Sequence, residues 1–363
     1  MKKYTYPLLA ISGGLLLTGC GGDDSSSNTE SATFSLGVSD APVDDANKVV
    51  LAFKDVVLIP FDPETGEQTG DHILLDASEN GALHQVDLME YQVDLMEYQV
   101  DLMEYQGKNA KTIISEQQIA PGDYAMCVYA KDGRQLNDTS LSYVEKTDGS
   151  VKGLVVPSRG SCFGFKPDTS DQGRLKFSQK GQYVKVHTGH NSYVVEFDLR
   201  KGLADPVGQE HMNMNSNAVS LVNASDSGHI AGTVSNVQYQ ACEADSAAWN
   251  AIHDVPAVHS VYLYAGSMDR STMGDMGATA PLNAPVAVAN VNESQDEEGN
   301  TTYSYEFGYI GPGTYSIGYT CTAYIDTPDA HETSEDGFLI YQHYTPVDVV
   351  ETELTTQDIN PIL

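Results

Sequence analysis

Histidine and methionine residues that could bind a metal ion occur in two short stretches of this 363-residue chain. His187 and His190 are separated only by Thr and Gly, and His211 is followed by Met212 and Met214. Imidazole and thioether ligands together would suit copper. The first stretch has no paired Cys and no downstream His or Glu at the spacing of a metal site, so we predict a loop with two exposed histidines. The second stretch is short and has no further support as a metal site, so we predict no metal ligands in either. Copper binding stays open as an alternative.

Acidic residues could supply oxygen ligands for calcium. They gather in segments 292–300 and 326–336, and in the turn Asp40-Ala-Pro-Val-Asp44-Asp45. Neither segment has the D-x-D-x-D-G-x5-E spacing of an EF-hand. We predict solvated loops, with Asp40 capping its turn through its side chain, as Asx residues do. Calcium binding is the second open alternative.

The usual catalytic motifs do not occur in the sequence. There is no G-x-S-x-G, no H-E-x-x-H and no phosphate-binding loop. We therefore predict that the chain is not an enzyme and has neither catalytic residues nor a cofactor. A hydrolase whose site is assembled from distant residues is the alternative that motifs cannot address.

The N-terminus has the layout of a secretory signal. Lys2 and Lys3 precede a short apolar stretch that ends in Leu17-Thr-Gly-Cys20. The apolar stretch is too short to span a bilayer, which takes roughly 20 residues. Its ending resembles the lipobox of bacterial lipoproteins. That resemblance implies that residues 1–19 are a signal peptide and that Cys20 is acylated, with palmitate among its lipids, and becomes the first mature residue.

Residues 20–31 predict a flexible tether, because after the cysteine they contain no large apolar side chain. Stable anchoring takes more than one acyl chain, and the triacylated cysteine implied by the resemblance meets that requirement. Gly21 stands where an Asp would retain a lipoprotein at the inner membrane. The resemblance thus implies a lipid anchor in the outer membrane, facing the periplasm or the cell surface.

The charge balance is strongly acidic. The chain has 19 Lys and Arg against 51 Asp and Glu, a formal net charge of −32. Phosphate backbones are bound by basic patches, so nucleic acid is excluded as a partner. Carbohydrate, an envelope polymer or another protein remain as ligands.

Four cysteines remain besides Cys20. An even number in an exported protein indicates disulfides, and four cysteines allow three pairings. We expect Cys127–Cys162 and Cys242–Cys321, because each pair then falls within one expected domain. No Cys-x-x-Cys spacing favours zinc.

Short apolar or alternating stretches with frequent turn residues predict an all-β fold. About 330 residues follow the tether, enough for two domains, and the polar run 223–228 marks a boundary. We expect two antiparallel β-sandwich domains, 32–222 and 228–363, after the signal peptide and tether. The expected strands are 32–38, 48–53, 56–59, 72–75, 124–130, 153–156, 173–177, 183–187, 193–198, 229–234, 258–265, 286–291, 301–307, 314–323 and 338–344, with a short helix at 240–254.

Two segments repeat within the chain. Ile119-Ala-Pro-Gly-Asp-Tyr124 matches Ile310-Gly-Pro-Gly-Thr-Tyr315, which predicts type II turns with each Tyr hydroxyl on backbone. The heptad Val86-Asp-Leu-Met-Glu-Tyr-Gln92 occurs three times without change over 86–106. No basic residue pairs with its acids, so a coiled coil is disfavoured. We interpret the heptads as a recent tandem duplication, with an adhesive element as the alternative.

Residues 34–57 have the sequence Phe-Ser-Leu-Gly-Val-Ser-Asp-Ala-Pro-Val-Asp-Asp-Ala-Asn-Lys-Val-Val-Leu-Ala-Phe-Lys-Asp-Val-Val. With Val86-Asp-Leu and Pro121-Gly-Asp-Tyr124, this segment resembles DUF4382, a bacterial lipoprotein family of unknown function. The resemblance covers roughly 32–200 and implies a β-rich exported domain without catalytic residues. The C-terminal half, with Pro312-Gly-Thr-Tyr315, is similar to transthyretin-like or carboxypeptidase-regulatory sandwiches. Together these features predict a membrane-anchored, non-catalytic binding or structural module of the cell envelope, with accessory metal binding as the alternative.

Overall fold

The computed structural model describes residues 32–41, 46–77, 84–87, 110–165, 172–179, 182–253, 255–296, 298–327 and 330–361. Expectations for the signal peptide, Cys20, the tether, Asp44, Asp45 and most of the heptad repeat fall outside these residues, as does the side chain of Asp40. The described chain is all-β and sandwich-like, with strands in four sheets and one long helix. Within it, no helix is long and apolar enough to cross a membrane.

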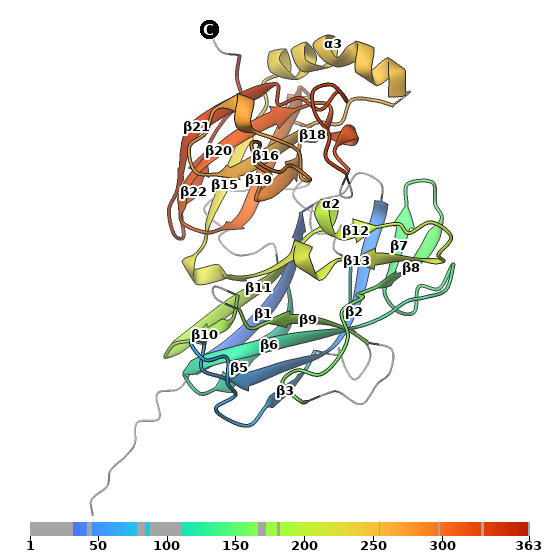
Figure 1. Ribbon diagram of the computed structural model, residues 1–363. Coiled ribbons are helices and arrows are strands. Elements are labelled where there is room, and N and C mark those ends of the chain that lie inside the picture. The colour runs from blue at the N-terminus through green and yellow to red at the C-terminus, as the bar shows by residue number, and fades with distance from the viewer. Residues whose placement is uncertain are drawn as a thin grey trace, which may run out of the picture.

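The first two sheets face each other in the N-terminal lobe (Figure 1). One has four strands in the order β14 (Val219–Asn223), β11 (Gly189–Asp198), β1 (Ala32–Ala41) and β5 (Lys111–Ile119). The other follows the order β10 (Val184–Val186), β6 (Gly122–Lys131), β2 (Ala46–Pro60), β7 (Tyr143–Lys146), β8 (Val151–Val155), β13 (His211–Met214) and β12 (Leu203–Ala204). β3 (Ile73–Asp76) and β4 (His84–Asp87) also pair with β2, and β9 (Gln172–Phe177) pairs with β6.

Strand alternation explains how the core forms between these sheets. Phe34 and Leu36 of β1 point to one face and pack in the same apolar cluster as Val56 and Leu58 of β2. β2 is buried almost continuously, because its other face is covered too. There Val57 lies in a second cluster, together with Ile59, Cys127, Tyr129 and Cys162. A strand covered on both faces has a continuous apolar sequence, which is why segments 48–53 and 56–59 form one strand.

The C-terminal lobe repeats this arrangement with two four-stranded sheets. Their orders are β18 (Asn292–Gln295), β19 (Thr301–Ile310), β15 (Gly228–Thr233), β22 (Leu354–Thr356) and β17 (Ala287–Asn290), β16 (Ser260–Ala265), β20 (Gly313–Thr320), β21 (Gln342–Val349). β16 is covered on both faces. Val261 and Leu263 pack between the sheets, whereas Tyr262 and Tyr264 pack under a loop with Phe338.

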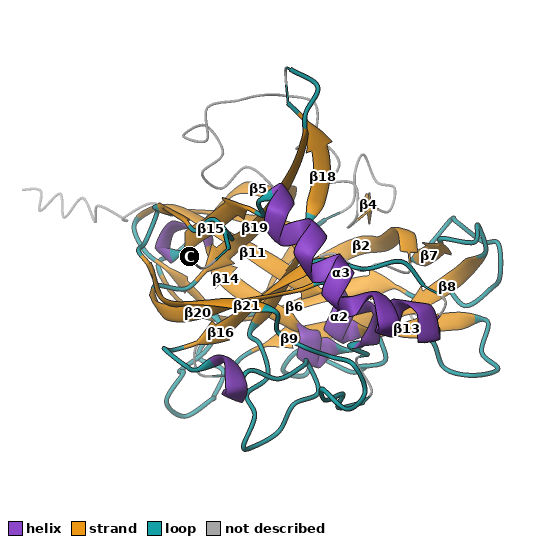
Figure 2. Ribbon diagram, turned by 90° about the horizontal axis from the view of Figure 1, so that it is seen from above, coloured by secondary structure: helices purple, strands orange, loops and turns teal. Residues whose placement is uncertain are grey.

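Helices are few. α2 (Leu199–Gly202) is a single turn that follows β11, and α3 (Asn236–His253) lies on the outside of the C-terminal lobe (Figures 1 and 2). The Tyr239 ring of α3 stacks on Tyr303 and His259 at centroid distances of 3.8 and 3.5 Å. The short 3-10 helices are η3 (Ser216–Ala218), η4 (Ala224–Asp226), η5 (Arg270–Thr272) and η6 (Ala323–Ile325).

Both disulfides join the cysteines as expected. Cys127 of β6 is bonded to Cys162, and Cys242 of α3 is bonded to Cys321, directly after β20. The second bond fixes the long helix to the sheet beneath it. All four cysteines are fully buried.

Several expectations differ from the structure in instructive ways. Three strand pairs are parallel, namely β1 with β11, β8 with β13 and β15 with β22, so the sheets are not purely antiparallel. The strands β5, β7, β13, β14 and β22 were not expected. β5 is polar over most of its length and lies at a sheet edge, where side chains need not alternate, and the other four are only three to five residues long. The helix begins four residues earlier than expected, at Asn236. Residues 292–295, expected in a loop, form β18.

At the turns before Tyr124 and Tyr315, the predicted hydroxyl contacts are confirmed and the predicted turn type is wrong. Each hydroxyl donates to the backbone oxygen four residues earlier, Ala120 and Gly311, at 2.8 Å. The type II assignment is wrong at both turns. Gly122 has a φ of 154°, far from the value near 80° of that turn, and Gly313 is not among the glycines with a positive φ.

One arginine links the two lobes. Arg200 of α2 is 5% exposed, and its guanidinium donates to the Ala323 oxygen at 3.2 Å and to Asn290 Oδ1 at 3.0 Å. Both acceptors belong to the C-terminal lobe, so this side chain fixes how the lobes meet.

Removing the disulfide of α3 is expected to destabilise the protein. The double substitution Cys242→Ala, Cys321→Ala frees a loop of 79 residues and should lower the free energy of unfolding by about 4 kcal/mol. Urea unfolding measures this change. The Cys127–Cys162 bond closes a loop of 35 residues. Its removal by Cys127→Ala, Cys162→Ala should lower the free energy of unfolding by a similar amount. An unchanged unfolding midpoint in either double variant would contradict the expectation.

Candidate functional site

The histidines of the first predicted stretch lie at the start of β11 and just before it. His190 Nδ1 is 3.1 Å from the Thr33 hydroxyl, and the His187 backbone N–H donates to Asn191 Oδ1. Both side chains are exposed. They lie beside a turn held by Asn191, and among the described residues nothing completes a metal site around them.

The second stretch forms β13, and strand alternation separates its side chains. Met212 and Met214 point into the N-terminal core, where they are 6% and 0% exposed. His211 is on the opposite face of the same strand. The structure therefore does not bring the imidazole and the two thioethers together as copper ligands.

The acidic segment 292–300 is a hairpin. The Asp296 carboxylate accepts from the backbone N–H of Glu298 and of Asn300, and Oδ2 accepts from the Asn300 side chain. Asp296 thus holds the turn between β18 and β19 through its own side chain, as Asx residues do.

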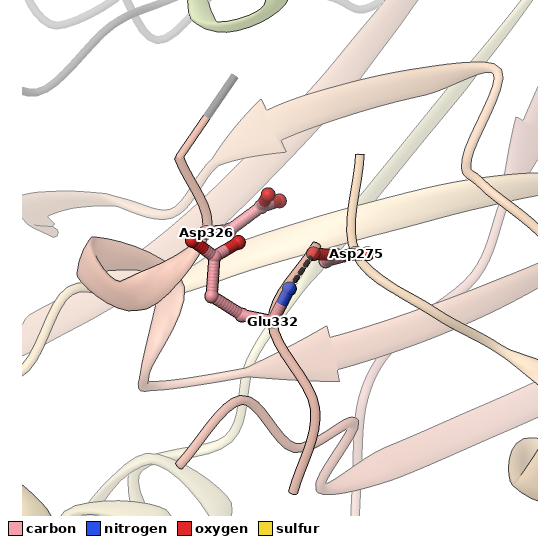
Figure 3. Close-up of side chains that lie close together, drawn as sticks. All are labelled: Asp275, Asp326 and Glu332. Carbon is pink, nitrogen blue, oxygen red and sulfur yellow. Dashed lines mark hydrogen bonds between the residues drawn. The ribbon is translucent and has the colours of Figure 1, made fainter. Parts of the chain in front are cut away.

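The acidic segment 326–336 is different, because it does not form a solvated loop throughout. Asp326 and Glu332 lie beside Asp275, with carboxylate oxygens of the three residues within 4.8 Å of one another (Figure 3). Asp275 is 0% exposed and Asp326 5% exposed. Sequence reasoning missed this cluster because Asp275 belongs to a distant loop and has no acidic neighbour.

Protein donors satisfy all six oxygens of this cluster. Asp326 accepts from the Tyr262 hydroxyl at 2.7 Å and from the Met276 N–H at 3.1 Å. Asp275 accepts from the Glu332 backbone N–H and pairs with His331. Both oxygens of Glu332 accept from Thr327, through its hydroxyl and its N–H. The three carboxylates therefore form a hydrogen-bonded network that ties one loop to another.

The network has an electrostatic cost. Burial raises the pKa of Asp326 to about 6, although hydrogen bonds from Tyr262 and Met276 and the charge of Arg200 lower it. Burial also raises the pKa of Glu332. Arg200 reaches this region from the other lobe, so the network and the contact between the lobes are electrostatically connected.

A cleft of about 410 Å³ lies where the two lobes meet. The N-terminal lobe contributes Glu196 and Asp198 of β11, and the C-terminal lobe contributes Tyr309 of β19 and Tyr315 of β20. On β11 these carboxylates alternate with core residues, so they point to the outer face of the sheet. The other lining residues are Gln182, Ala218, Ser220, Leu221, Val222, Asn223, Asp226, Ser227, Val286, Ala287, Ile310 and Gly311.

Two groups in the cleft stand out because they lack partners. The Tyr309 hydroxyl is buried and makes no hydrogen bond, in a residue that is 5% exposed. The Glu196 carboxylate is partly buried and accepts no hydrogen bond from any described residue. Burial, and then the charge of Asp198, raise the pKa of Glu196 to about 8. Burial likewise raises the pKa of Tyr309, with a further contribution from the charge of Glu196.

Unsatisfied polar groups in a cavity of this size are typical of a ligand site. Ligand cavities measure roughly 300–1,000 Å³, and a buried hydroxyl without a partner costs about 1–3 kcal/mol. The cleft is therefore the candidate functional site. Its residues come from five strands, β11, β14, β17, β19 and β20, and from the turns beside them, so no local motif could have indicated it.

Comparison with known proteins identifies the N-terminal half. Residues 31–216 match the family model DUF4382, described as a domain of unknown function. The chain belongs to this family. The matched segment includes β1, β11 and β13 and ends before β14. The matched segment supplies Gln182, Glu196 and Asp198 to the cleft, and the other lining residues lie beyond the match.

No curated protein sequence matches the chain. Among solved structures, it is similar to an adhesin candidate from Bacteroides ovatus, with 9% identity and a TM-score of 0.17, over 96% of this chain and 100% of the other. It is also similar to the fimbrial anchor protein Mfa2 from Porphyromonas gingivalis, with 6% identity and a TM-score of 0.16, over 83% and 82% of the two chains. At such TM-scores these likenesses carry no argument about fold or function.

The raised pKa of Asp326 predicts a pH-dependent stability. The folded protein keeps this proton up to about pH 6, whereas the unfolded chain releases it near 3.8. Its contribution is thus fully present below pH 3.8 and is lost as the pH rises to about 6, by roughly 3 kcal/mol in all. The substitution Asp326→Asn removes this titration.

Urea unfolding of both proteins at several pH values measures the effect as a difference. The stability of the wild type relative to the Asp326→Asn variant should fall between pH 4 and pH 7. A part of the stability difference that does not vary with pH reports the hydrogen bonds that the amide changes. The part that varies with pH reports the titration of Asp326. A difference that does not vary with pH would show that burial does not raise this pKa.

Proposed function

We propose that this protein is a lipid-anchored, non-catalytic binding module of the cell envelope. The observation that carries the proposal is the cleft between the lobes, which presents partnerless polar groups on a rigid frame of paired strands. Ligand sites on strands are held more precisely than those on loops. Carbohydrate, an envelope polymer or a protein would supply the ligand.

The anchor is proposed from the N-terminal sequence. Residues 1–19 would be removed, Cys20 would carry the lipid, and the tether 20–31 would lead to β1, which begins at Ala32. Gly21 favours the outer membrane. We place the division between two domains in the turn that contains η4, between β14 and β15, and assign the second domain to the transthyretin-like sandwiches.

The metal-binding alternative is not carried forward. The copper ligands are separated by strand alternation, and the carboxylates of Asp275, Asp326 and Glu332 already accept hydrogen bonds from protein donors.

Cys20→Ala is expected to release the protein from the membrane fraction, because no acyl chain can then be attached. Fractionation of cells, followed by protease treatment of intact cells, measures anchoring and exposure together. Protease should remove the wild type if its ligands lie outside the cell, and should spare it until the outer membrane is opened if they lie in the periplasm. A Cys20→Ala protein that stays in the membrane fraction would contradict the lipid anchor.

Gly21→Asp is expected to move the protein to the inner membrane in a bacterium that sorts its lipoproteins. Ser25→Asp is the matched control, because it adds the same charge four residues further along the tether. Separation of the two membranes by density measures the change. Equal distribution of both variants would show that Gly21 does not determine the location.

A further inference from the structure

We propose that the cleft between the lobes binds the primary ammonium group of a small hydroxylated ligand, such as an amino sugar. This inference rests on the proposed binding function and names the ligand chemistry of that same site. Glu196, Asp198 and Tyr309 would surround the ammonium group, and the apolar wall of the cleft would contact the carbon frame of the ligand.

The charge of the cleft selects a cation. Its lining includes the carboxylates of Glu196, Asp198 and Asp226, and no lysine, arginine or histidine is among the lining residues described. The nearby guanidinium of Arg200 is directed to Ala323 and Asn290. The charges of Lys201 and Arg200 act on Asp198, but no basic side chain is among the described lining residues, so an anionic ligand would meet net repulsion.

The free hydrogen-bonding groups select a donor. Most polar side chains of the cleft already have partners: Gln182 with the Leu221 backbone, Asn223 with Asp226, and the Tyr315 hydroxyl with Gly311. The Tyr309 hydroxyl has no partner, and Glu196 accepts no hydrogen bond from any described residue. An ammonium group donates three hydrogen bonds, which match the Glu196 carboxylate, the Tyr309 oxygen and the second oxygen of Asp198, whose first oxygen accepts from the Lys201 N–H.

The residues paired with Glu196 in the sheet leave space for an ammonium group. Its register partner on β1 is Ser39, whose buried hydroxyl also lacks a hydrogen bond, and its partner on β14 is Ser220. Side chains of paired residues lie on the same face of a sheet. The carboxylate is thus flanked by small hydroxyl groups that leave room in front of it.

The wall opposite favours an organic cation over a metal ion. Val286, Ala287 and Ile310 line the cleft, and Val286 is 54% exposed. A hard metal ion takes six or more oxygens around it, and an apolar wall offers none. A carbon frame would instead bury this surface, and its hydroxyl groups would reach the polar rim at Asn223 and Asp226.

Binding should release a proton. Glu196 is protonated in the free protein at pH 6.5, because burial and Asp198 raise its pKa to about 8. The other titratable groups that line the cleft are Asp226, Tyr309 and Tyr315, with the His229 ring edge-on to Tyr309 at 5.7 Å. Glu306 acts on Tyr309 through its charge, and Lys201 and Arg200 act on Asp198. An adjacent ammonium favours the ionised carboxylate. The release of up to about one proton per ligand follows.

The test is calorimetric titration of the detergent-solubilised full-length chain at pH 6.5 with glucosamine, and with glucose as the neutral analogue. Two buffers of different ionisation enthalpy report the proton released. Glucosamine should bind with a Kd on the order of 1 mM or tighter, and glucose at least about tenfold more weakly, since hydrogen bonds to charged groups are the stronger ones.

Two variants and a control locate the site. Tyr309→Phe removes only a hydroxyl that has no partner, so folding is preserved and affinity should fall about fivefold. Glu196→Gln should lower affinity at least about tenfold and abolish proton release. Glu306→Gln is the control, because Glu306 of β19 is, like Glu196, a partly buried carboxyl with a raised pKa, but it does not line the cleft and acts on Tyr309 only through its charge. Its loss of affinity should be much smaller than that of Glu196→Gln.

Each contrary result overturns the inference. Equal affinity for glucose would show that the ammonium is not recognised, and binding of neither compound would exclude this ligand class. A loss in Glu306→Gln equal to that in Glu196→Gln would place the effect outside the cleft. None of these results bears on the lipid anchor, which the Cys20→Ala fractionation tests separately.

Discussion

The parallel pairing of β1 with β11 is the interaction on which the N-terminal lobe depends. It runs over ten residue pairs, from Ala32 with Gly189 to Ala41 with Asp198, and joins segments about 157 positions apart. Bringing such distant segments together has a large entropic cost, so the pairing forms only with the core that it closes. It also decides which residues reach the outer face. The same alternation that buries Val195 and Phe197 turns Glu196 and Asp198 toward the other lobe.

The fold class could be predicted from the sequence because the core strands keep their apolar pattern. β1, β2, β6 and β11 are recognisable from their own residues. The disulfide pairing could be predicted as well, because each pair falls within one expected domain. Edge strands such as β5 could not be found, since half of their hydrogen-bonding capacity faces solvent and their side chains need not alternate. The parallel pairs could not be predicted either, because the residues of a strand do not show which other strand lies beside it in the sheet.

The site was harder to predict than the fold for the same physical reason. Glu196 is an acid within the apolar stretch Tyr193–Phe197 of β11, and its role depends on which residues of the other lobe pack against it. Tyr309 is one of 21 tyrosines, and only the structure shows that its hydroxyl lacks a partner. In the acidic segment 326–336, the sequence indicates exposure where the structure shows burial. Its composition predicts a solvated loop, yet Tyr262 and the backbone draw Asp326 inside and satisfy it.

The position of β1 determines how the N-terminal lobe responds to force. β1 lies inside its sheet, bonded to β11 on one side and to β5 on the other, and the chain enters it at Ala32. A pull through the residues that precede Ala32, opposed by a load on the C-terminal lobe, acts along the strand axis, because β11 leads directly into the α2 turn and Arg200. The hydrogen bonds of β1 then share the tension together instead of opening one after another. A domain tethered by this end would resist extraction of its first strand under shear.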